Sequence, residues 1–555
     1  MLPLARNRRR PFELVDLLNI AAHISIRQGD LCSGRSLLEE AIENYWVVRR
    51  GIESDPALRK IWLKRQRHLF DTLMHRVLLP LGEAATALEL LQQTKAASLQ
   101  DLLDESHVEF AARQNDEIRK LWQQMNEMQN QLEDAETSKG EIEEAQLRIK
   151  LRSARSELRS AVGAAGIRDS GIAPLKLAEL RSRLNDSATA VADFSVSNDG
   201  AVAFLLLPGD SRVRSLAFRG EEFTHSGAYG EGVKANIGRM LNDLFQFVMD
   251  CKDTGDSLLA VLKQSGARRL ILIPSGSLSR LPLHAATDPK TNRCLLDEFA
   301  AVSYAPNLQI LQLCLERPVR KLGKLVAIQD PSATLHSAPA EVESICGLFS
   351  DRIVLTGHTA SREAVIQNVI DADALHFACH GYFNLGSPLS SGVRLAGGEL
   401  TLGDVYNGIV VSKGALVSVA ACESSVFDSV YPDEFVGFPS AFLHAGACAA
   451  VGGMWRVDDV STALIMRKYY SSILQGGKNP AEALSLAQKW IRGSTAAELN
   501  LVSVFEDQYV KSNREDADAY RSMRYFQDQL ESKPFQDPFF WAGFALYGAP
   551  SDPKA

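Results

Sequence analysis

The first hundred residues carry apolar side chains at a helical period. Leu17 to Ile24 space their apolar residues as one helix face, and Gln28-Gly29-Asp30 interrupts the pattern. Apolar residues resume at the same period from Gly34 to Ile42. The pattern predicts a helix–turn–helix pair with small residues where the two helices cross.

This pair resembles a tetratricopeptide repeat, in which Gly34, Leu38 and Ala41 would be the small and bulky positions of the second helix. The usual aromatic positions are missing, and one repeat alone cannot close a solenoid core. A generic helical hairpin therefore remains an equal alternative over residues 1–104.

A further helix is predicted from Ala84 to Leu103, followed by a strongly polar helical stretch. Its apolar residues step by three and four along a heptad seam, and Ser138-Lys139-Gly140 breaks the seam. We predict an antiparallel helical hairpin over residues 105–165. The glycines and proline of Gly163–Pro174 indicate a linker.

After about residue 188, short apolar runs alternate with helical segments. The predicted strands are 190–196, 201–207, 269–273, 324–328, 374–377, 415–420 and 449–453. The predicted helices between them are 233–250, 340–349, 361–370, 435–445 and 460–474. Apolar strands joined by crossover helices predict a mostly parallel sheet covered on both faces. A polar insert, Ser494–Lys533, precedes the last predicted strand.

Composition narrows the class of protein further. A chain of 555 residues contains more than one structural unit, and its net charge of −8 gives no general attraction to nucleic acid or anionic lipid. Its eight cysteines show no paired framework and no zinc spacing, which is typical of a reducing compartment. No apolar stretch reaches membrane-spanning length, and the start does not resemble a signal peptide. We expect a cytoplasmic protein without a metal or cofactor and without direct nucleic-acid or membrane binding.

Two predicted strands run directly into chemically reactive residues. The strand at 374–377 leads to Cys379, His380 and Gly381, and the strand at 415–420 leads to Cys422. Ligands of parallel sheets collect beyond the carboxyl ends of the strands, where an imidazole can activate a thiol. The N–H of Gly381 could bind an oxyanion. On these residues alone, a buried thiol and a core histidine remain the alternative.

Cys379 and His376 are predicted to be core residues. Cys379 would point to the opposite strand face from its neighbour His380. His376 lies four residues before His380 on the same strand face, about 13 Å back along the strand.

Several ordered blocks resemble the CHAT domain, a caspase-like module that is related to caspases and separase and often follows tetratricopeptide repeats. The blocks are Ile271–Ala286, Ser303–Pro306, His376–Gly381, Leu416–Ser424, Glu434–Ala447, Trp455–Asp459 and Pro538–Phe544. The resemblance covers about residues 186 to 549. Asn307 and Phe435 depart from the family pattern, where serine and glycine are usual.

The resemblance implies an α/β caspase-like fold behind an all-α region. Residues 166–325 would form a degenerate half of the CHAT domain, and residues 326–550 the catalytic half. Cys422 would be the nucleophile and His380 the general base, with the N–H groups of Gly381 and Cys422 as oxyanion donors.

The expected function is that of a cysteine endopeptidase that cleaves a protein substrate. A protein activator would bind through the helical N-terminal part. The alternative is a CHAT interaction scaffold without proteolysis that uses its helices as an adaptor. A third reading, an acyltransferase or thiol hydrolase, is less favoured because no cofactor-binding motif is present.

The substrate pocket is expected near the strand that leads to Cys422 and the strand that leads to Trp455. Candidate pocket residues are Asp428, Glu434, Trp455, Asp458 and Asp459. The carboxylates would favour a basic substrate residue, although Asp458 and Asp459 could instead cap the following helix. Arg394 and Arg456 would favour an acidic one, so the sign of the preference stays open.

Overall fold

A computed structural model describes most of the chain. The described residues are 11–51, 56–114, 175–218, 233–249, 257–317, 320–384, 387–420, 437–511 and 514–549, with scattered residues between 119 and 161. The chain forms two compact units, Met1–Pro174 with Tyr431–Glu434, and Leu175–Val430 with Phe435–Ala555.

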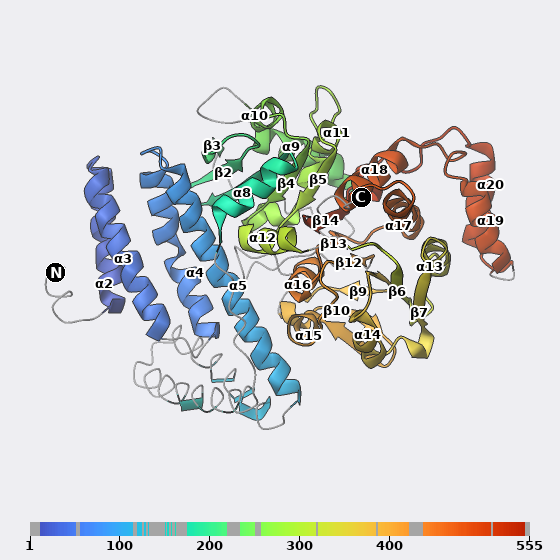
Figure 1. Ribbon diagram of the computed structural model, residues 1–555, viewed down its shortest axis with the longest axis horizontal. Coiled ribbons are helices and arrows are strands. Elements are labelled where there is room, and N and C mark those ends of the chain that lie inside the picture. Colours follow the sequence, from blue (N-terminus) through green and yellow to red (C-terminus); the bar gives the residue numbers. More distant parts are fainter. Residues whose placement is uncertain are drawn as a thin grey trace. The chain divides into compact units, whose positions relative to one another are not determined.

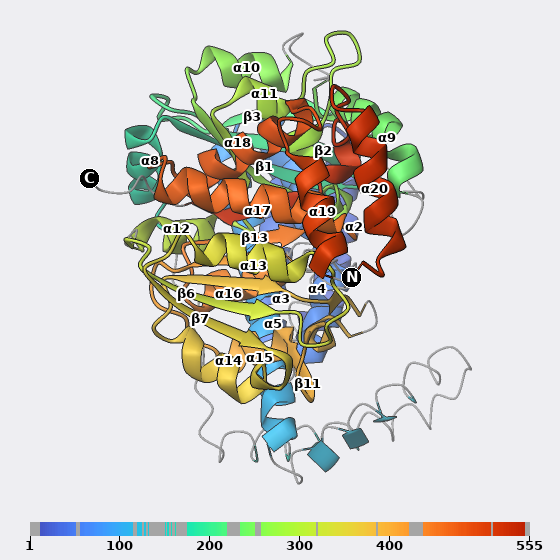
Figure 2. The same ribbon diagram turned by 90° about the vertical axis from the view of Figure 1, so that its right-hand side faces the viewer.

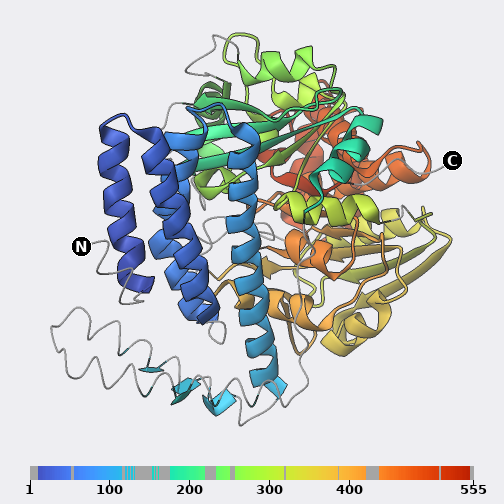
Figure 3. The ribbon, with the colours of Figure 1, turned by 60° about the vertical axis from the view of Figure 1, so that its left-hand side comes forward.

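The first unit is helical, as predicted. Its helices, which lie side by side as long rods in Figure 3, are α2 (Pro11–Arg27), α3 (Leu31–Gly51), α4 (Pro56–Thr72) continued by the π-helical turn η1 (Leu73–Leu78), and α5 (Ala84–Gln114). The turn between α2 and α3 falls at the predicted break. A Cβ atom on Gly34 would lie 2.6 Å from Cγ1 of Ile26, so the two helices require a small residue there. Most of the predicted hairpin at 105–165 and the linker Gly163–Pro174 lie outside the described residues.

The second unit is built on one sheet. Its strands are β1 (Thr189–Ser197), β2 (Gly200–Leu206), β3 (Arg214–Phe218), β4 (Arg269–Ile273), β5 (Ala301–Tyr304), β6 (Lys324–Gln329), β7 (Asp351–Thr356), β8 (Ala374–Ala378), β12 (Leu416–Val419), β13 (Ala449–Gly453) and β14 (Phe544–Gly548). Their order is β3-β2-β1-β4-β5-β14-β13-β12-β8-β6-β7. The antiparallel neighbours are β1–β2, β2–β3 and β13–β14, and the other neighbours are parallel, as predicted.

Helices cover both faces of this sheet. They are α8 (Leu177–Asp186), α9 (Val233–Met249), α10 (Leu258–Gln264), α11 (Leu295–Glu298), α12 (Leu308–Glu316), α13 (Ala338–Cys346), α14 (Arg362–Val369), α15 (Leu402–Gly408), α16 (Phe438–Ala445), α17 (Asp459–Leu474) and α18 (Pro480–Gly493). Figure 2 shows α13, α17 and α18 in front of the sheet. Neighbouring residues of β8 confirm the two layers, because His376 contacts Tyr470 of α17 and Phe377 contacts Phe442 of α16.

Two smaller features lie outside the main sheet. The short strands β9 (Gly381–Tyr382), β10 (Gly392–Leu395) and β11 (Gly398–Thr401) form a separate three-stranded sheet directly after β8. The polar insert at 494–533 contains the helices α19 (Leu501–Lys511) and α20 (Ala517–Asp528), which lie side by side beyond α18 in Figure 1. They pack chiefly on each other, with Phe505 stacked on Phe526 at a ring distance of 5.7 Å.

Within the described ranges, no helix combines the length and the apolar character needed to cross a membrane.

Candidate active site

His380 stands at the carboxyl edge of the sheet, two residues beyond the end of β8. Its backbone carbonyl accepts a hydrogen bond from the Arg394 amide at 2.8 Å, which ties the residue to the β9–β10 sheet. Since this bond flanks the Gly381–Val393 pair, that pair is a non-hydrogen-bonded position of the antiparallel ladder. The N–H of Gly381 therefore points away from β10 and is not used in that ladder.

The His380 imidazole is held by a residue of the neighbouring strand end. Its Nε2 lies 2.7 Å from the Oγ1 of Thr334, in the loop that follows β6. β6 and β8 are parallel neighbours in the sheet, so their carboxyl ends bring this loop beside His380. Thr334, which was not among the residues expected from the sequence, thus contacts His380 directly.

The buried carboxylate of Asp330 organises the loop that carries Thr334. It accepts hydrogen bonds from the Ser332 hydroxyl at 2.5 Å and from the backbone amides of Ser332, Thr334 and Leu335 at 3.1, 2.5 and 2.6 Å. Burial acts to raise the pKa of Asp330, but these hydrogen bonds outweigh burial and lower it below its usual value. Ala333 is thereby kept in the left-handed region at a φ of 56°, a conformation that costs a non-glycine residue about 1–2 kcal/mol.

The hydrogen-bond chain fixes the tautomer of His380. Ionised Asp330 only accepts, so Ser332 spends its single hydroxyl proton on that carboxylate. In the 2.9 Å bond between Ser332 and Thr334, Thr334 must then be the donor. Its oxygen consequently accepts from His380, which places a proton on Nε2, so that in the neutral imidazole Nδ1 carries the free electron pair. Nδ1 is the nitrogen that can act as a base.

Three of the predicted site residues, Cys422, Asp428 and Glu434, lie outside the described residues. The strand that precedes Cys422 is described, and β12 pairs in parallel with β8 up to Val419 and Phe377. Along the sequence, Cys422 and His380 each follow three residues after this last pair. The two strands that precede His380 and Cys422 in the sequence are therefore neighbours in the sheet.

The competing thiol Cys379 is buried in the core. Burial raises its pKa strongly, and Asp330 and Glu341 act in the same direction. A thiol in such surroundings stays protonated and is a poor nucleophile. Burial also raises the pKa of Cys294 and Cys314 to about 11 and that of Cys448 to about 12. Cys251 lies outside the described residues.

Two other histidines have structural roles. His376 is fully buried, and its Nε2 lies 3.0 Å from Oε1 of Glu341, which confirms the predicted core role. His284 is buried in the other half of the sheet, with its Nδ1 at 2.8 Å from the Tyr304 hydroxyl. Burial lowers the pKa of His284 to about 3, so this imidazole stays neutral.

The remaining pocket candidates follow β13, the next strand beyond β12. The Trp455 side chain is buried, and its indole N–H donates to the Phe539 carbonyl at 3.1 Å. The Asp458 carboxylate caps α17 by accepting from the Ser461 amide at 2.9 Å. Both side chains are therefore engaged within the protein.

Asp459 differs from its neighbour because it keeps an exposed edge. Protein atoms crowded around its carboxylate nevertheless desolvate it and raise its pKa, and Asp458 and Glu341 act in the same direction. His380 and Arg456 oppose the shift, so Asp459 lies within electrostatic reach of His380. Of the described pocket candidates, Asp459 is the exposed carboxylate that interacts electrostatically with His380.

Within the described part of the chain, no three side chains of His, Cys, Asp or Glu gather into a group that could hold a metal ion. At this sheet edge, the His380 imidazole is held by Thr334, the Gly381 N–H points away from β10, and β12, the strand that precedes Cys422 in the sequence, lies beside β8.

Residues 239–549 match the CHAT domain family, which is more than half of the chain. The chain belongs to the CHAT domain family, and its predicted fold class is confirmed. A comparison with curated proteins finds no match.

Solved structures provide distant neighbours. The Arg specific cysteine proteinase gingipain R is 9% identical, with a TM-score of 0.31, over 58% of this chain and 69% of its own. Separase of Saccharomyces cerevisiae, in complex with securin, is 10% identical, with a TM-score of 0.44, over 96% of this chain and 48% of its own. This chain thus spans about half the length of the separase chain. The complex of Porphyromonas gingivalis RgpB pro- and mature domains is 8% identical, with a TM-score of 0.32, over 57% of this chain and 69% of its own.

Proposed function

We propose that this protein is a cysteine endopeptidase in which His380 activates Cys422. The observation that carries the proposal is the hydrogen-bond chain from Asp330 through Ser332 and Thr334 to Nε2 of His380. This chain orients the imidazole and leaves Nδ1 as the base at the edge shared with the strand that leads to Cys422.

In the proposed reaction, Nδ1 of His380 takes the proton of the Cys422 thiol. The thiolate sulfur forms a bond to the carbonyl carbon of a peptide, and the electron pair of the C=O bond moves to oxygen. The N–H groups of Gly381 and Cys422 bind this oxyanion, and such a donor contributes about 3 kcal/mol to the transition state.

The intermediate then collapses with cleavage of the C–N bond. His380 returns its proton to the leaving amine, and the acyl group stays on sulfur as a thioester. A water molecule attacks the thioester after losing a proton to Nδ1, and the thiol leaves with that proton. The products are two peptides and the regenerated enzyme.

The Asp330–Thr334 loop contributes to each proton transfer. When Nδ1 carries a proton, the imidazole is positively charged and Nε2–H donates more strongly to Thr334. A hydrogen bond to a charged group contributes roughly 1.5–3 kcal/mol. The negative charge of Asp330 at the far end of the chain stabilises the same state.

For substrate selection, we propose that Asp459 favours a basic residue near the cleaved bond. Its exposed carboxylate within reach of His380 supports this sign. The exposed Arg394 and Arg456 support the opposite preference for an acidic residue. Peptides with a basic residue and peptides with an acidic residue near the cleaved bond must therefore both be tested. A cleavage profile of a peptide library decides between them.

The remaining parts of the proposal concern partners and location. A protein substrate is expected, and an activator protein would bind the helical unit of residues 1–165. The proposed compartment is the cytoplasm, and the described cysteines, all free thiols, fit a reducing compartment.

The test is the alkylation rate of Cys422 by iodoacetamide in the full chain, followed by mass spectrometry across a pH series. This reaction needs no substrate, so it also reports on an enzyme that awaits an activator. The proposal expects Cys422 to react faster than Cys32, and His380→Ala to abolish the difference. If Cys422 and Cys32 react at equal rates and His380→Ala leaves both rates unchanged, the non-proteolytic interaction scaffold is favoured instead.

A further inference from the structure

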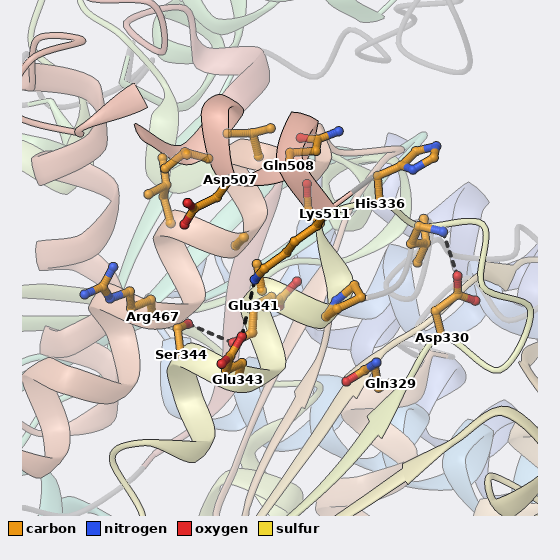
Figure 4. A pocket seen from close by; sticks show the side chains of 18 of the residues that line it. Gln329, Asp330, His336, Glu341, Glu343, Ser344, Arg467, Asp507, Gln508 and Lys511 are labelled. Carbon is orange, nitrogen blue, oxygen red and sulfur yellow. Dashed lines mark hydrogen bonds and ion pairs between the residues drawn. The ribbon is translucent and has the colours of Figure 1, made fainter. Parts of the chain in front are cut away.

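A cavity of about 600 Å³ lies between the α13–α17 layer and α19 (Figure 4). The helices α17 and α19 each present one stripe of side chains to this cavity, at positions i, i+3, i+4 and i+7. The stripe of α17 is Val460, Ala463, Leu464 and Arg467, and that of α19 is Val504, Asp507, Gln508 and Lys511. The cavity is therefore a groove with a helix on two sides.

The lining of this groove mixes apolar and polar side chains. Leu335 and the apolar members of the α17 stripe are partly or fully buried, whereas Ala333, Pro339 and Ala340 are exposed. The carboxylates of Asp330 and Glu341, which also line the groove, are buried. Arg467 and Asp507, which are both exposed, make no ion pair or hydrogen bond with other residues that the structure describes. The Lys511–Glu343 ion pair spans 3.5 Å between two largely exposed side chains and adds little stability.

The α19–α20 hairpin borders the groove, and its two helices contact each other more than they contact the helices that cover the sheet. Its two helices bury their aromatic side chains against each other, as in the pair of Tyr509 and Tyr520 with ring centres 5.2 Å apart. The apolar residues of the groove are thus not covered by the hairpin's own core.

One loop is shared by the groove and the candidate active site. Ala333 and Leu335 line the groove, and Thr334 between them bonds to Nε2 of His380. Figure 4 shows Asp330, which anchors this loop, at the opposite end of the lining side chains from Arg467. The loop that orients His380 therefore forms part of the wall of the groove.

We propose that the groove binds a short amphipathic helix of a protein partner, and that the bound helix repositions Thr334 and with it His380. The second half of this proposal rests on the proposed peptidase function, whereas binding does not.

The geometry favours a helix as the occupant. Two flanking stripes with a helical period, apolar side chains along α17 and exposed charges beside them match the way in which amphipathic helices dock into grooves. The two unpaired charges set the orientation of the partner. It would place an acidic side chain against Arg467 and a basic side chain against Asp507.

Binding is tested with a phage-displayed library of 16-residue amphipathic helical peptides, selected against the full chain that carries Cys422→Ala. The proposal expects enriched peptides that lose at least tenfold in affinity for Ala463→Arg, which fills the groove. Lys478→Glu changes an exposed charge beyond the end of α17 and should leave affinity unchanged. The double variant Arg467→Asp/Asp507→Arg should select peptides with the two charges exchanged.

Coupling is tested on the same Cys422→Ala chain by NMR of labelled histidine, with the His380 signals assigned through His380→Ala. Peptide binding should shift the His380 signals, and Thr334→Val should bind the peptide without that shift. Enrichment that is indifferent to Ala463→Arg, or binding without a shift at His380, would overturn the proposal. Neither readout requires proteolysis, so a failed peptidase function shows itself separately, in the alkylation of Cys422.

Discussion

Replacing Thr334 with valine removes the hydroxyl that accepts a hydrogen bond from the Nε2–H of His380 and keeps nearly the same side-chain volume. The bond spans 2.7 Å, and its partner becomes positively charged during catalysis. Such bonds contribute roughly 1.5–3 kcal/mol, or roughly 10- to 150-fold in rate at 1.4 kcal/mol per tenfold. Thr334 is exposed, so water can replace part of the lost bond. We therefore expect a loss of about tenfold.

Two assays check this expectation. One is the alkylation rate of Cys422 by iodoacetamide at pH 7, and the other is kcat/KM on a peptide found by library profiling. The matched control is Thr334→Ser, which keeps the hydroxyl and should retain most of the rate. Thermal unfolding should be nearly unchanged for both variants, since the position lies at the surface.

A spectroscopic readout separates an orienting role from a structural one. In the native chain, ¹⁵N shifts of His380 should report a proton on Nε2, and Thr334→Val should show a mixture of the two tautomers. Unchanged alkylation rates together with unchanged ¹⁵N shifts in Thr334→Val would refute the assigned hydrogen-bond chain.

Four further outcomes are expected. Cys422→Ala and His380→Ala each abolish peptide cleavage while circular dichroism shows an intact fold; near-normal cleavage by either would contradict the dyad. Cys379→Ala destabilises the fold by roughly 1 kcal/mol in urea unfolding and leaves activity unchanged, because this thiol is buried and protonated. Asp330→Asn lowers the free energy of unfolding at pH 7, and this difference from the native chain fades in acid. The reason is that folding depresses the pKa of Asp330. The carboxylate therefore stabilises the fold fully above the pKa that it has in the unfolded chain, and this stabilisation is lost as the pH falls through the pKa of the folded state. A fragment 166–555 keeps His380-dependent alkylation of Cys422 but loses cleavage of the natural substrate; full activity of the fragment would remove the regulatory role of the helical unit.

The sheet was predictable where burial on both faces makes a strand uniformly apolar. β4 and β13 have the predicted bounds for this reason. β7 was not predicted because it is an edge strand, and its exposed positions include Asp351 and Arg352. The polar insert at 494–533 gave no helical prediction, since α19 and α20 bury side chains mainly against each other.

The candidate site was predictable as far as strand ends could be read from the sequence. His380 follows an apolar run and therefore marks a carboxyl edge. Thr334 could not be assigned to the site, because only the strand order places the loop after β6 beside β8. The run Asp330-Pro331-Ser332 directly after a predicted strand was the available signal, since these residue types build hydrogen-bonded turns.

β14 has a consequence for how the protein reaches its folded state. This strand, late in the chain, fills the gap between β13 and β5, which belong to different halves of the sheet. While that gap is empty, both halves offer unpaired strand edges that can recruit another chain. Closing the gap requires contacts between residues far apart in sequence, which form slowly. Refolding should thus compete with aggregation. A synthetic peptide with the sequence of β14 should inhibit refolding, because it would occupy the gap between β13 and β5 instead of the chain's own β14.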